Sequence, residues 1–217
     1  MLKLYYSPGA VSLVTHMVLE ETGLPYELER VAILEGQQHT PEYRRIHPLS
    51  RVPALELGAG DVLTETPAIL QYLSDLAPAA GLMPVEMRGR ARANEWMSLF
   101  ASHVHVTLIT FYRPQRYTDD APAHTALQRD GKARFIELLG HIEARLPERG
   151  FLLGDRYGAV DAYAAVFVIW ARRLRISMAA FPRYGALTDR VLARPAVRRA
   201  LDQEGLESAY APPVDAA

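Results

Sequence analysis

Glu65 and Thr66 stand at the start of a predicted helix, where their groups can cap the helix or contact a charged ligand. Glu65 places a carboxylate, which attracts a cation, directly before Thr66. The Thr66 hydroxyl and the free N–H groups of a helix start favour an anion. Thr66-Pro67 is also the pattern of an N-cap followed by proline, so the alternative is a simple helix cap with Glu65 in solvent.

Hydroxyl groups gather around a second predicted helix start. Ser12 opens the predicted helix 12–22, and Tyr5, Tyr6 and Ser7 precede it. A hydrogen-bond donor beside a helix N-terminus stabilises a thiolate. The chain itself has no cysteine, which excludes disulfides, thiolate metal ligands and a protein thiol nucleophile. Any thiol chemistry must therefore use a thiol that the ligand carries.

Composition and charge restrict the function classes. The 217 residues carry a formal net charge of −1, with 49% hydrophobic and 23% charged residues, as in ordinary globular proteins. Nucleic-acid binding needs a basic field and adhesion to an anionic membrane needs a polybasic stretch, and the sequence offers neither. The N-terminus lacks the pattern of a signal peptide, and no apolar run reaches the length of a membrane helix. We therefore expect a cytoplasmic protein.

The first third of the chain alternates short apolar runs with amphipathic stretches, which predicts alternating strands and helices. The strands are expected at residues 2–6, 26–31, 52–57 and 62–63. Helices are expected at residues 12–22, after Thr40-Pro41 and after Thr66-Pro67. Residues 58–61 fit a hairpin loop. The expected order is βαβ, then α, then ββα.

The remainder of the sequence is predicted to be helical. Helices are expected at residues 86–112, 123–146, 159–173, 185–193 and 195–202, with 159–173 as the central buried helix. Residues 78–84, rich in Pro, Ala and Gly, suggest a linker, and the closing PPVDAA tail is expected to be mobile. The predicted domains are 1–78 and 87–217, joined by a linker at 79–86.

Several segments, in order along the whole chain, resemble one family. They are Arg51 to Leu55, Glu65 to Leu73, the opening LYYSPGAVSL, Glu95-Trp96 with His105, Phe151 to Asp161, and Arg194 to Leu201. The first two resemble the glutathione-binding signature of the glutathione transferase family. The opening and the spacing from Trp96 to His105 are similar to the bacterial beta class.

The resemblance implies a fold and a function. The implied fold class is α/β plus all-α, with an N-terminal thioredoxin-like βαβαββα domain followed by an all-helical C-terminal domain. The implied activity is conjugation of the glutathione thiol to hydrophobic electrophiles, as in detoxification, with glutathione as co-substrate, without a metal, in a homodimer. Two alternatives stay open. One is a protein that binds glutathione or an apolar ligand with little turnover, and the other is a different glutathione-dependent enzyme, such as an isomerase, dehalogenase or peroxidase.

The resemblance also implies the contacts to glutathione. They are Glu65 and Thr66 for the γ-glutamyl end, Val52 and a cis Pro53 for the cysteinyl backbone, and Arg51 and Gln38 for the glycyl carboxylate. Arginine suits a carboxylate because it binds both oxygens. The alternatives are a trans proline at an edge strand and an arginine in solvent.

The residue that activates the thiol departs from the beta class. Val11 stands where that class has a cysteine, and it can donate only its backbone N–H. Ser12 is the first candidate for the thiolate donor and Tyr5 the second, and the alternatives are a helix cap and a core strand residue. His105 aligns with a beta-class histidine near the sulfur, and its alternative is a structural helix residue.

Two further departures affect the catalytic chemistry, because Ser98 and Val106 replace an asparagine and a lysine of the beta class. The second substrate is expected between the domains, against an apolar and aromatic wall. The candidates are Val104, Leu108, Phe111 and Tyr112, with Trp170 as a further one, and all of them also fit a core between helices. Asp161, three residues after Gly158, is expected to act as a structural cap.

Overall fold

A computed structural model gives the structure of the chain and describes residues 1–206. It has two compact units: Met1–Val85 together with the segment that begins at Asp189, and Glu86–Thr188. The domain limits predicted at residues 78 and 87 stay a prediction. The PPVDAA tail lies outside the described residues.

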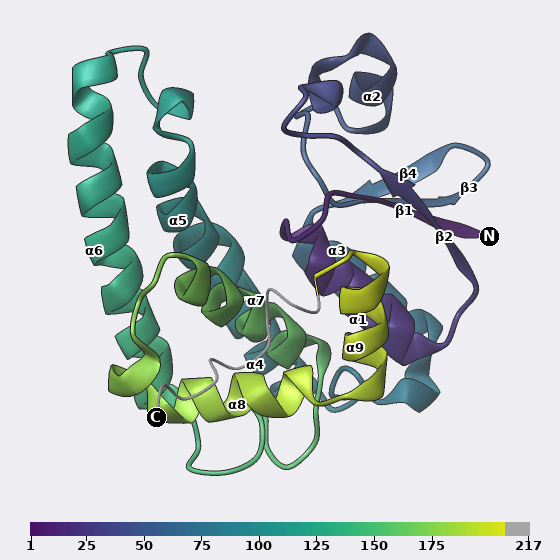
Figure 1. Ribbon diagram of the computed structural model, residues 1–217. Coiled ribbons are helices and arrows are strands. Elements are labelled where there is room, and N and C mark those ends of the chain that lie inside the picture. Colours follow the sequence, from purple (N-terminus) through teal and green to yellow (C-terminus); the bar gives the residue numbers. More distant parts are fainter. Residues whose placement is uncertain (207–217) are drawn as a thin grey trace. The chain divides into compact units, whose positions relative to one another are not determined.

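The first unit is built on a four-stranded mixed sheet in the order β2-β1-β3-β4 (Figure 1). The strands are β1 (Leu2–Tyr6), β2 (Tyr26–Arg30), β3 (Ala54–Gly58) and β4 (Asp61–Thr64). β1 runs parallel to β2 and antiparallel to β3, which pairs antiparallel with β4. The βαβ, α, ββα order predicted from the sequence is confirmed, although β3 begins at Ala54 because Pro53 has no N–H for the ladder.

Helices cover both faces of this sheet. α1 (Ser12–Thr22) and α3 (Thr66–Leu76) lie on one face, and α2 (Pro41–Ile46) lies on the other (Figure 1). Side chains of a strand alternate between the faces. Accordingly Tyr5 packs with Tyr43 of α2, while the neighbouring Leu4 is fully buried. Because both faces of β1 are apolar, the strand packs against both helical layers.

The two threonines predicted to cap helices behave differently. The Thr40 side chain accepts a hydrogen bond from the N–H of Tyr43, which confirms its role as the cap of α2. Thr66 is instead the first residue of α3, and Glu65 takes the cap position without a side-chain hydrogen bond. The prediction of Thr66 as N-cap was therefore wrong, because Glu65 adopts φ 69° and ψ 114° and turns the chain one residue earlier.

The hairpin between β3 and β4 is confirmed and is shorter than predicted. Its two turn residues, Ala59 and Gly60, both have positive φ angles, 52° and 80°. Two-residue hairpin loops favour this left-handed geometry because it matches the twist of the flanking strands. Asp61, expected in the loop, already belongs to β4.

The second unit is helical. It contains α4 (Met87–Leu99), α5 (His105–Tyr112), α6 (Ala121–Arg145) and α7 (Ala159–Arg173), and α8 (Pro182–Leu192) begins in it. A helix over residues 86–112 was expected, and helical structure does run without a break from Met87 to Tyr112, but it is not α-helical throughout. Phe100–Val104 forms a π-helical segment between α4 and α5, and the N–H of His105 donates to the carbonyl of Phe100, five residues back. The π-helical turn holds one extra residue, and hydrophobic periodicity is too coarse to reveal a change of that size in a single turn.

α7 is the central helix of this unit, as its apolar sequence predicted. All its residues from Ala159 to Ala171 are buried. Phe100 packs edge-on against Tyr163 with ring centroids 5.3 Å apart, and lies 5.4 Å from Phe167. Aromatic pairs of this kind contribute about 0.5–1.5 kcal/mol beyond their buried area.

The helix start of α7 is held by Asp161, which confirms the predicted cap. Its two carboxylate oxygens accept hydrogen bonds from the N–H groups of Leu152 and Gly158, both at 2.8 Å. The carboxylate thus ties the preceding loop to the first turn of the helix.

α9 (Pro195–Gln203) belongs to the first unit and packs along α1 (Figure 1). Arg194 holds both carboxylate oxygens of Glu21, at 2.5 and 2.8 Å. Arg199 donates to Glu20 at 2.6 Å. The C-terminal helix is thereby attached to the helix that follows β1.

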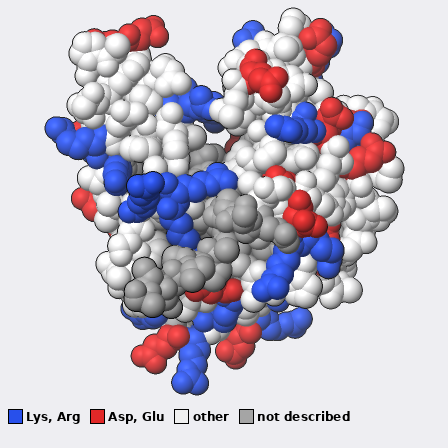
Figure 2. Space-filling model, in the orientation of Figure 1, with Lys and Arg blue, Asp and Glu red and all other residues white. Residues whose placement is uncertain are grey.

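The surface carries charges of both signs on the face drawn in Figure 2. This agrees with the net charge of −1 over the whole sequence. Among residues 1–206, no helix is long and apolar enough to cross a membrane.

Candidate functional site

Three segments of the first unit meet at one end of its sheet. Tyr5 near the end of β1 pairs with Ala54 at the start of β3, and Ala54 pairs with Thr64 at the end of β4. The loop after β1, the Val52-Pro53 pair before β3 and the Glu65-Thr66 pair after β4 must therefore emerge at the same sheet end. Strand pairing thus brings together groups that are up to 60 residues apart in the sequence.

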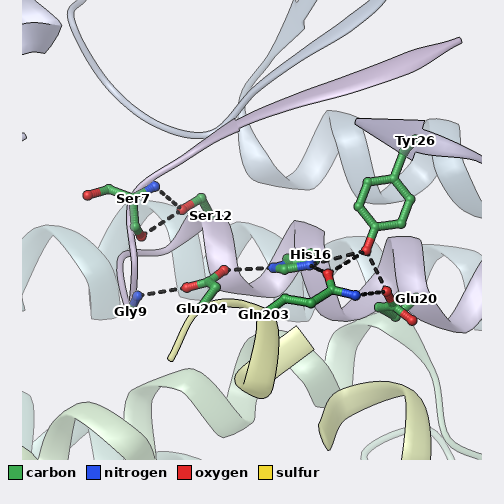
Figure 3. A network of polar contacts seen from close by, with 8 residues as sticks. All are labelled: Ser7, Gly9, Ser12, His16, Glu20, Tyr26, Gln203 and Glu204. Carbon is green, nitrogen blue, oxygen red and sulfur yellow. Dashed lines mark hydrogen bonds and ion pairs between the residues drawn. The ribbon is translucent and has the colours of Figure 1, made fainter. Parts of the chain in front are cut away.

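The loop from β1 to α1 is closed by its own hydrogen bonds (Figure 3). The N–H of Ser7 donates to the Ser12 hydroxyl oxygen at 3.1 Å, and that hydroxyl donates to the Ser7 carbonyl at 3.2 Å. The N–H of Ala10 also donates to the Ser7 carbonyl. Gly9 has a φ of 66°, a left-handed conformation that glycine adopts without steric cost.

These bonds determine what Ser12 can offer. Its side chain is fully buried, and its one hydroxyl proton lies on the Ser7 carbonyl. Its role as thiolate donor stays a prediction, and it now requires that the bond to Ser7 be exchanged for one to the ligand. The N–H groups of Val11 and Ser12, at the start of α1, have no intrahelical acceptor and are therefore the simpler donors.

Tyr5, the second candidate donor, is also engaged. Its hydroxyl donates to the Glu56 carboxylate at 3.0 Å, and its ring packs edge-on against Tyr43. Burial, the hydrogen bond to Glu56 and the charge of Glu56 raise the pKa of Tyr5 to about 12. A weaker acid is a weaker donor to a thiolate, so the predicted role of Tyr5 has no support in its surroundings.

The Val52-Pro53 peptide bond is cis, as the resemblance implied. Val52 is half-buried and Pro53 buried. Glu65 has an exposed side chain and a left-handed backbone, which is uncommon outside glycine and concentrates at functional sites. Thr66 is buried at the first position of α3, where N–H groups lack intrahelical partners.

His47 directly follows α2, and the sequence analysis gave it no role. It is 3% exposed, and its Nδ1 has no hydrogen-bond partner in the described chain. Burial lowers the pKa of His47 below its ordinary 6.5; the Glu65 carboxylate opposes this shift and the Arg51 guanidinium adds to it. His47 therefore lies within electrostatic reach of both, and no spacing rule in the sequence indicated this.

The two residues predicted for the glycyl carboxylate differ in exposure. Arg51 is exposed, and its carbonyl accepts the Tyr43 hydroxyl at 2.7 Å, which fixes the backbone just before Val52. Gln38 is 7% exposed, and its Oε1 makes no hydrogen bond to residues 1–206. A buried polar atom without a partner is uncommon and is consistent with a group that a ligand would satisfy.

The predicted residues of the second unit fall into two groups. Val104 and Leu108 are fully buried, so they belong to the helical core and do not face an open surface. Phe111 is half-buried and Tyr112 is 41% exposed. Burial raises the pKa of Tyr112, and the nearby Arg173 opposes that shift. Only the second group can contact a bound molecule.

His105 begins α5 directly after the π-helical segment. Its ring lies 5.4 Å from that of Trp170 in α7. Trp170 is buried, which is the core role that the sequence left as its alternative. The function of His105 stays a prediction.

Comparison with known proteins agrees with this architecture. Residues 10–76 match the glutathione S-transferase N-terminal domain, and residues 114–203 match the glutathione S-transferase C-terminal domain. Glutathione S-transferase GstA of Escherichia coli O157:H7 is 30% identical over 95% of this chain and 100% of its own length.

Two further proteins show how far the likeness extends. A glutathione transferase homologue from Sulfitobacter, solved with bound glutathione, has a TM-score of 0.90 and 30% identity over 94% of this chain and 98% of its own. Maleylacetoacetate isomerase of Pseudomonas aeruginosa is 27% identical over 92% of this chain and 95% of its own length. The near-complete match to GstA and the two domain matches lead to one conclusion: the chain belongs to the glutathione S-transferase family.

Proposed function

We propose that the chain conjugates the thiol of glutathione to hydrophobic electrophiles. The observation that carries the proposal is the meeting of three segments at one sheet end: the loop at the start of α1, Val52-Pro53 and Glu65-Thr66. Each supplies a different kind of group. Together they match the carboxylates, the ammonium, the peptide backbone and the thiol of glutathione.

The charged ends of glutathione are assigned to charged and dipolar groups. The exposed Glu65 carboxylate pairs with the γ-glutamyl ammonium, and the N-terminal N–H groups of α3 at Thr66 receive the neighbouring carboxylate. Arg51 and the side-chain N–H₂ group of Gln38 donate to the glycyl carboxylate, whereas the unpartnered Gln38 Oε1 is an acceptor and is left for an N–H of the ligand. The Val52 backbone pairs with the cysteinyl unit.

The thiol is activated at the start of α1. A free thiol has a pKa of about 8.5, so the thiolate is the minor form at neutral pH. The free N–H groups of Val11 and Ser12 and the positive end of the helix dipole favour the thiolate over the thiol. The thiolate sulfur then bonds to the electrophilic carbon while a leaving group departs with its electron pair or a double bond opens. The thiol proton passes to solvent.

The second unit supplies the contact for the electrophile, through Phe111 and Tyr112. Their aromatic rings suit an apolar substrate. A cytoplasmic homodimer, as in the implied family arrangement, completes the proposal. The binding protein is an outcome that the experiment below distinguishes, and a shifted thiol pKa without conjugation would support another glutathione-dependent enzyme.

The test is a pH titration of bound glutathione by thiolate ultraviolet absorbance, with affinity measured in the same titration. We expect a thiol pKa below neutral and conjugation of a nitro-activated aryl halide. Binding with an unshifted thiol would support the binding protein, and the absence of binding would refute the site. Glu65→Gln should raise the KM for glutathione about tenfold or more, because it removes an ionic hydrogen bond to the ammonium. Asp61→Asn, at the exposed hairpin of the same sheet, is the matched control.

A further inference from the structure

Within the helical unit, α5 and α6 pack against each other, and Gly131 of α6 lies in their contact (Figure 1). Gly131 is buried inside a long helix, where glycine is disfavoured relative to alanine. Its φ angle is not positive, so the backbone conformation does not require glycine at this position. A glycine inside a helix without such a requirement indicates a need for space.

A side chain at Gly131 would meet the backbone of α5. An added Cβ would lie 3.1 Å from the nitrogen of Phe111 and 3.2 Å from the carbonyl oxygen of Thr107. In an α-helix each N–H donates to the carbonyl four residues earlier, so these two atoms are the ends of one hydrogen bond of α5. Backbone atoms cannot rotate aside as a flexible side chain can. One helix must therefore move by a few tenths of an ångström to admit a single methyl group.

The loop between the two helices is bonded to both of them. The Tyr117 hydroxyl donates to the carbonyl of Val106 in α5 at 3.4 Å, and Nε2 of His124 in α6 donates to the carbonyl of Thr118 at 2.9 Å. A slide of α5 along α6 would break these bonds. An added methyl group at Gly131 is therefore accommodated most easily by a sideways displacement of α5 away from α6.

The opposite face of α5 lies toward the end of α7. His105 and Tyr112 are seven residues apart and so share a face, away from the backbone atoms that would meet a Cβ at Gly131. The His105 ring lies 5.4 Å from the ring of Trp170. Burial raises the pKa of Tyr112, and the charge of nearby Arg173 opposes that shift. A displacement of α5 away from α6 therefore moves Tyr112 toward α7.

Tyr112 is the exposed aromatic side chain that the proposed function assigns to the electrophile. We propose that Gly131 is a positioning residue that sets the size of the accepted electrophile, because its lack of a side chain lets α5 lie close to α6 and keeps Tyr112 away from α7. The inference rests on the proposed glutathione-conjugating function. Gly131 is buried and acts only through α5.

The test compares Gly131→Ala with Gly140→Ala, a matched control on the same helix. The nearest described neighbour of an added Cβ at Gly140 would be Cε1 of the Phe181 side chain, at 3.7 Å, which is an ordinary contact. Both variants add one methyl group and the same gain in helix propensity. The probes are a one-ring and a two-ring aryl halide, each activated by nitro groups. The quantities measured are kcat/KM for each probe and the KM for glutathione.

Gly131→Ala should lower kcat/KM about tenfold for the two-ring probe and by at most about threefold for the one-ring probe, because a small displacement is felt most by the wider substrate. The KM for glutathione should stay within about twofold, since its proposed contacts lie in the first unit. Gly140→Ala should leave all three values unchanged. Adding Tyr112→Ala to Gly131→Ala should restore the ratio of the two probes, and trimming Tyr112 would not repair a general loss of folding.

Equal ratios of the two probes in Gly131→Ala and Gly140→Ala would refute the inference. Tyr112→Ala alone tests it if Gly131→Ala does not fold: the ratio of two-ring to one-ring turnover should rise about threefold, and an unchanged ratio would show that the position of Tyr112 does not set the substrate size. If the unaltered protein conjugates neither probe, the proposed function fails and this inference fails with it. Conjugation of both probes with ratios that none of these variants changes would overturn this inference alone.

Discussion

Replacing Asp161 tests how much of the helical unit depends on one carboxylate. The side chain is 1% exposed, and its oxygens accept the N–H groups of Leu152 and Gly158 at 2.8 Å. Asp161→Ala leaves both N–H groups buried near the start of α7. We expect Asp161→Asn to be milder, because the amide keeps one oxygen acceptor.

The magnitude follows from the two bonds. A hydrogen bond to a charged group contributes about 1.5–3 kcal/mol, and each buried donor left without a partner costs about 1–3 kcal/mol. Asp161→Ala should therefore lower the free energy of unfolding by about 3–5 kcal/mol, and Asp161→Asn by about half of that. Because domains are stable by only about 5–15 kcal/mol, the alanine variant should approach the limit of stable folding.

The assay is equilibrium unfolding in urea, followed by tryptophan fluorescence. The chain has two tryptophans, Trp96 and Trp170, and both lie in the helical unit that Asp161 supports. Asp119→Asn removes the same charge from an exposed position of that unit and controls for charge alone. A midpoint for Asp161→Asn equal to that of the Asp119→Asn control would refute the reasoning.

Two further predictions concern pH and backbone geometry. The lowered pKa of His47 means that the folded state binds fewer protons than the unfolded state just below pH 6.5, so stability should fall as the pH drops through that value. In His47→Asn this part of the pH dependence should be missing. Urea unfolding of both proteins at about pH 5.5 and about pH 7.5, followed by circular dichroism, measures it. An equal loss of stability in the variant and the unaltered protein between the two pH values would contradict the prediction. Gly150 and Gly36 have similar φ angles, 85° and 82°, but an added Cβ would lie 2.7 Å from the Gly154 carbonyl only at Gly150. Gly36→Ala should therefore cost about 1 kcal/mol and Gly150→Ala about 2–3 kcal/mol, and equal thermal shifts of the two variants would refute the steric argument.

Local signals in the sequence were sufficient for most elements. A short apolar run indicated β1, Thr40-Pro41 indicated the start of α2, and the longer apolar run of α7 indicated a buried helix. These features depend on neighbouring residues, so spacing alone predicts them. The π-helical segment at Phe100–Val104 was not predicted, because it alters one helical turn without changing the apolar pattern.

Motifs in the sequence predicted which residues form the site, and tertiary contacts decide which of their groups are available to a ligand. Val52-Pro53 and Glu65-Thr66 stand out in the sequence, but their meeting at one sheet end depends on the pairing of Ala54 with Thr64. The hydrogen bonds between Ser12 and the Ser7 backbone could not be predicted either, because the sequence at a helix start is the same whether or not the serine hydroxyl is already bonded.

By itself the sequence determined the order of the elements, the absence of a protein thiol and the family signature, since each is a property of residue types and short spacings. Only the tertiary structure decided that Glu204 lies on Gly9 and His16, and that His47 lies within reach of Glu65. Such contacts arise when helices and strands distant in the chain pack around one core. Their energies depend on burial and on distances between atoms, which no local pattern of residues specifies.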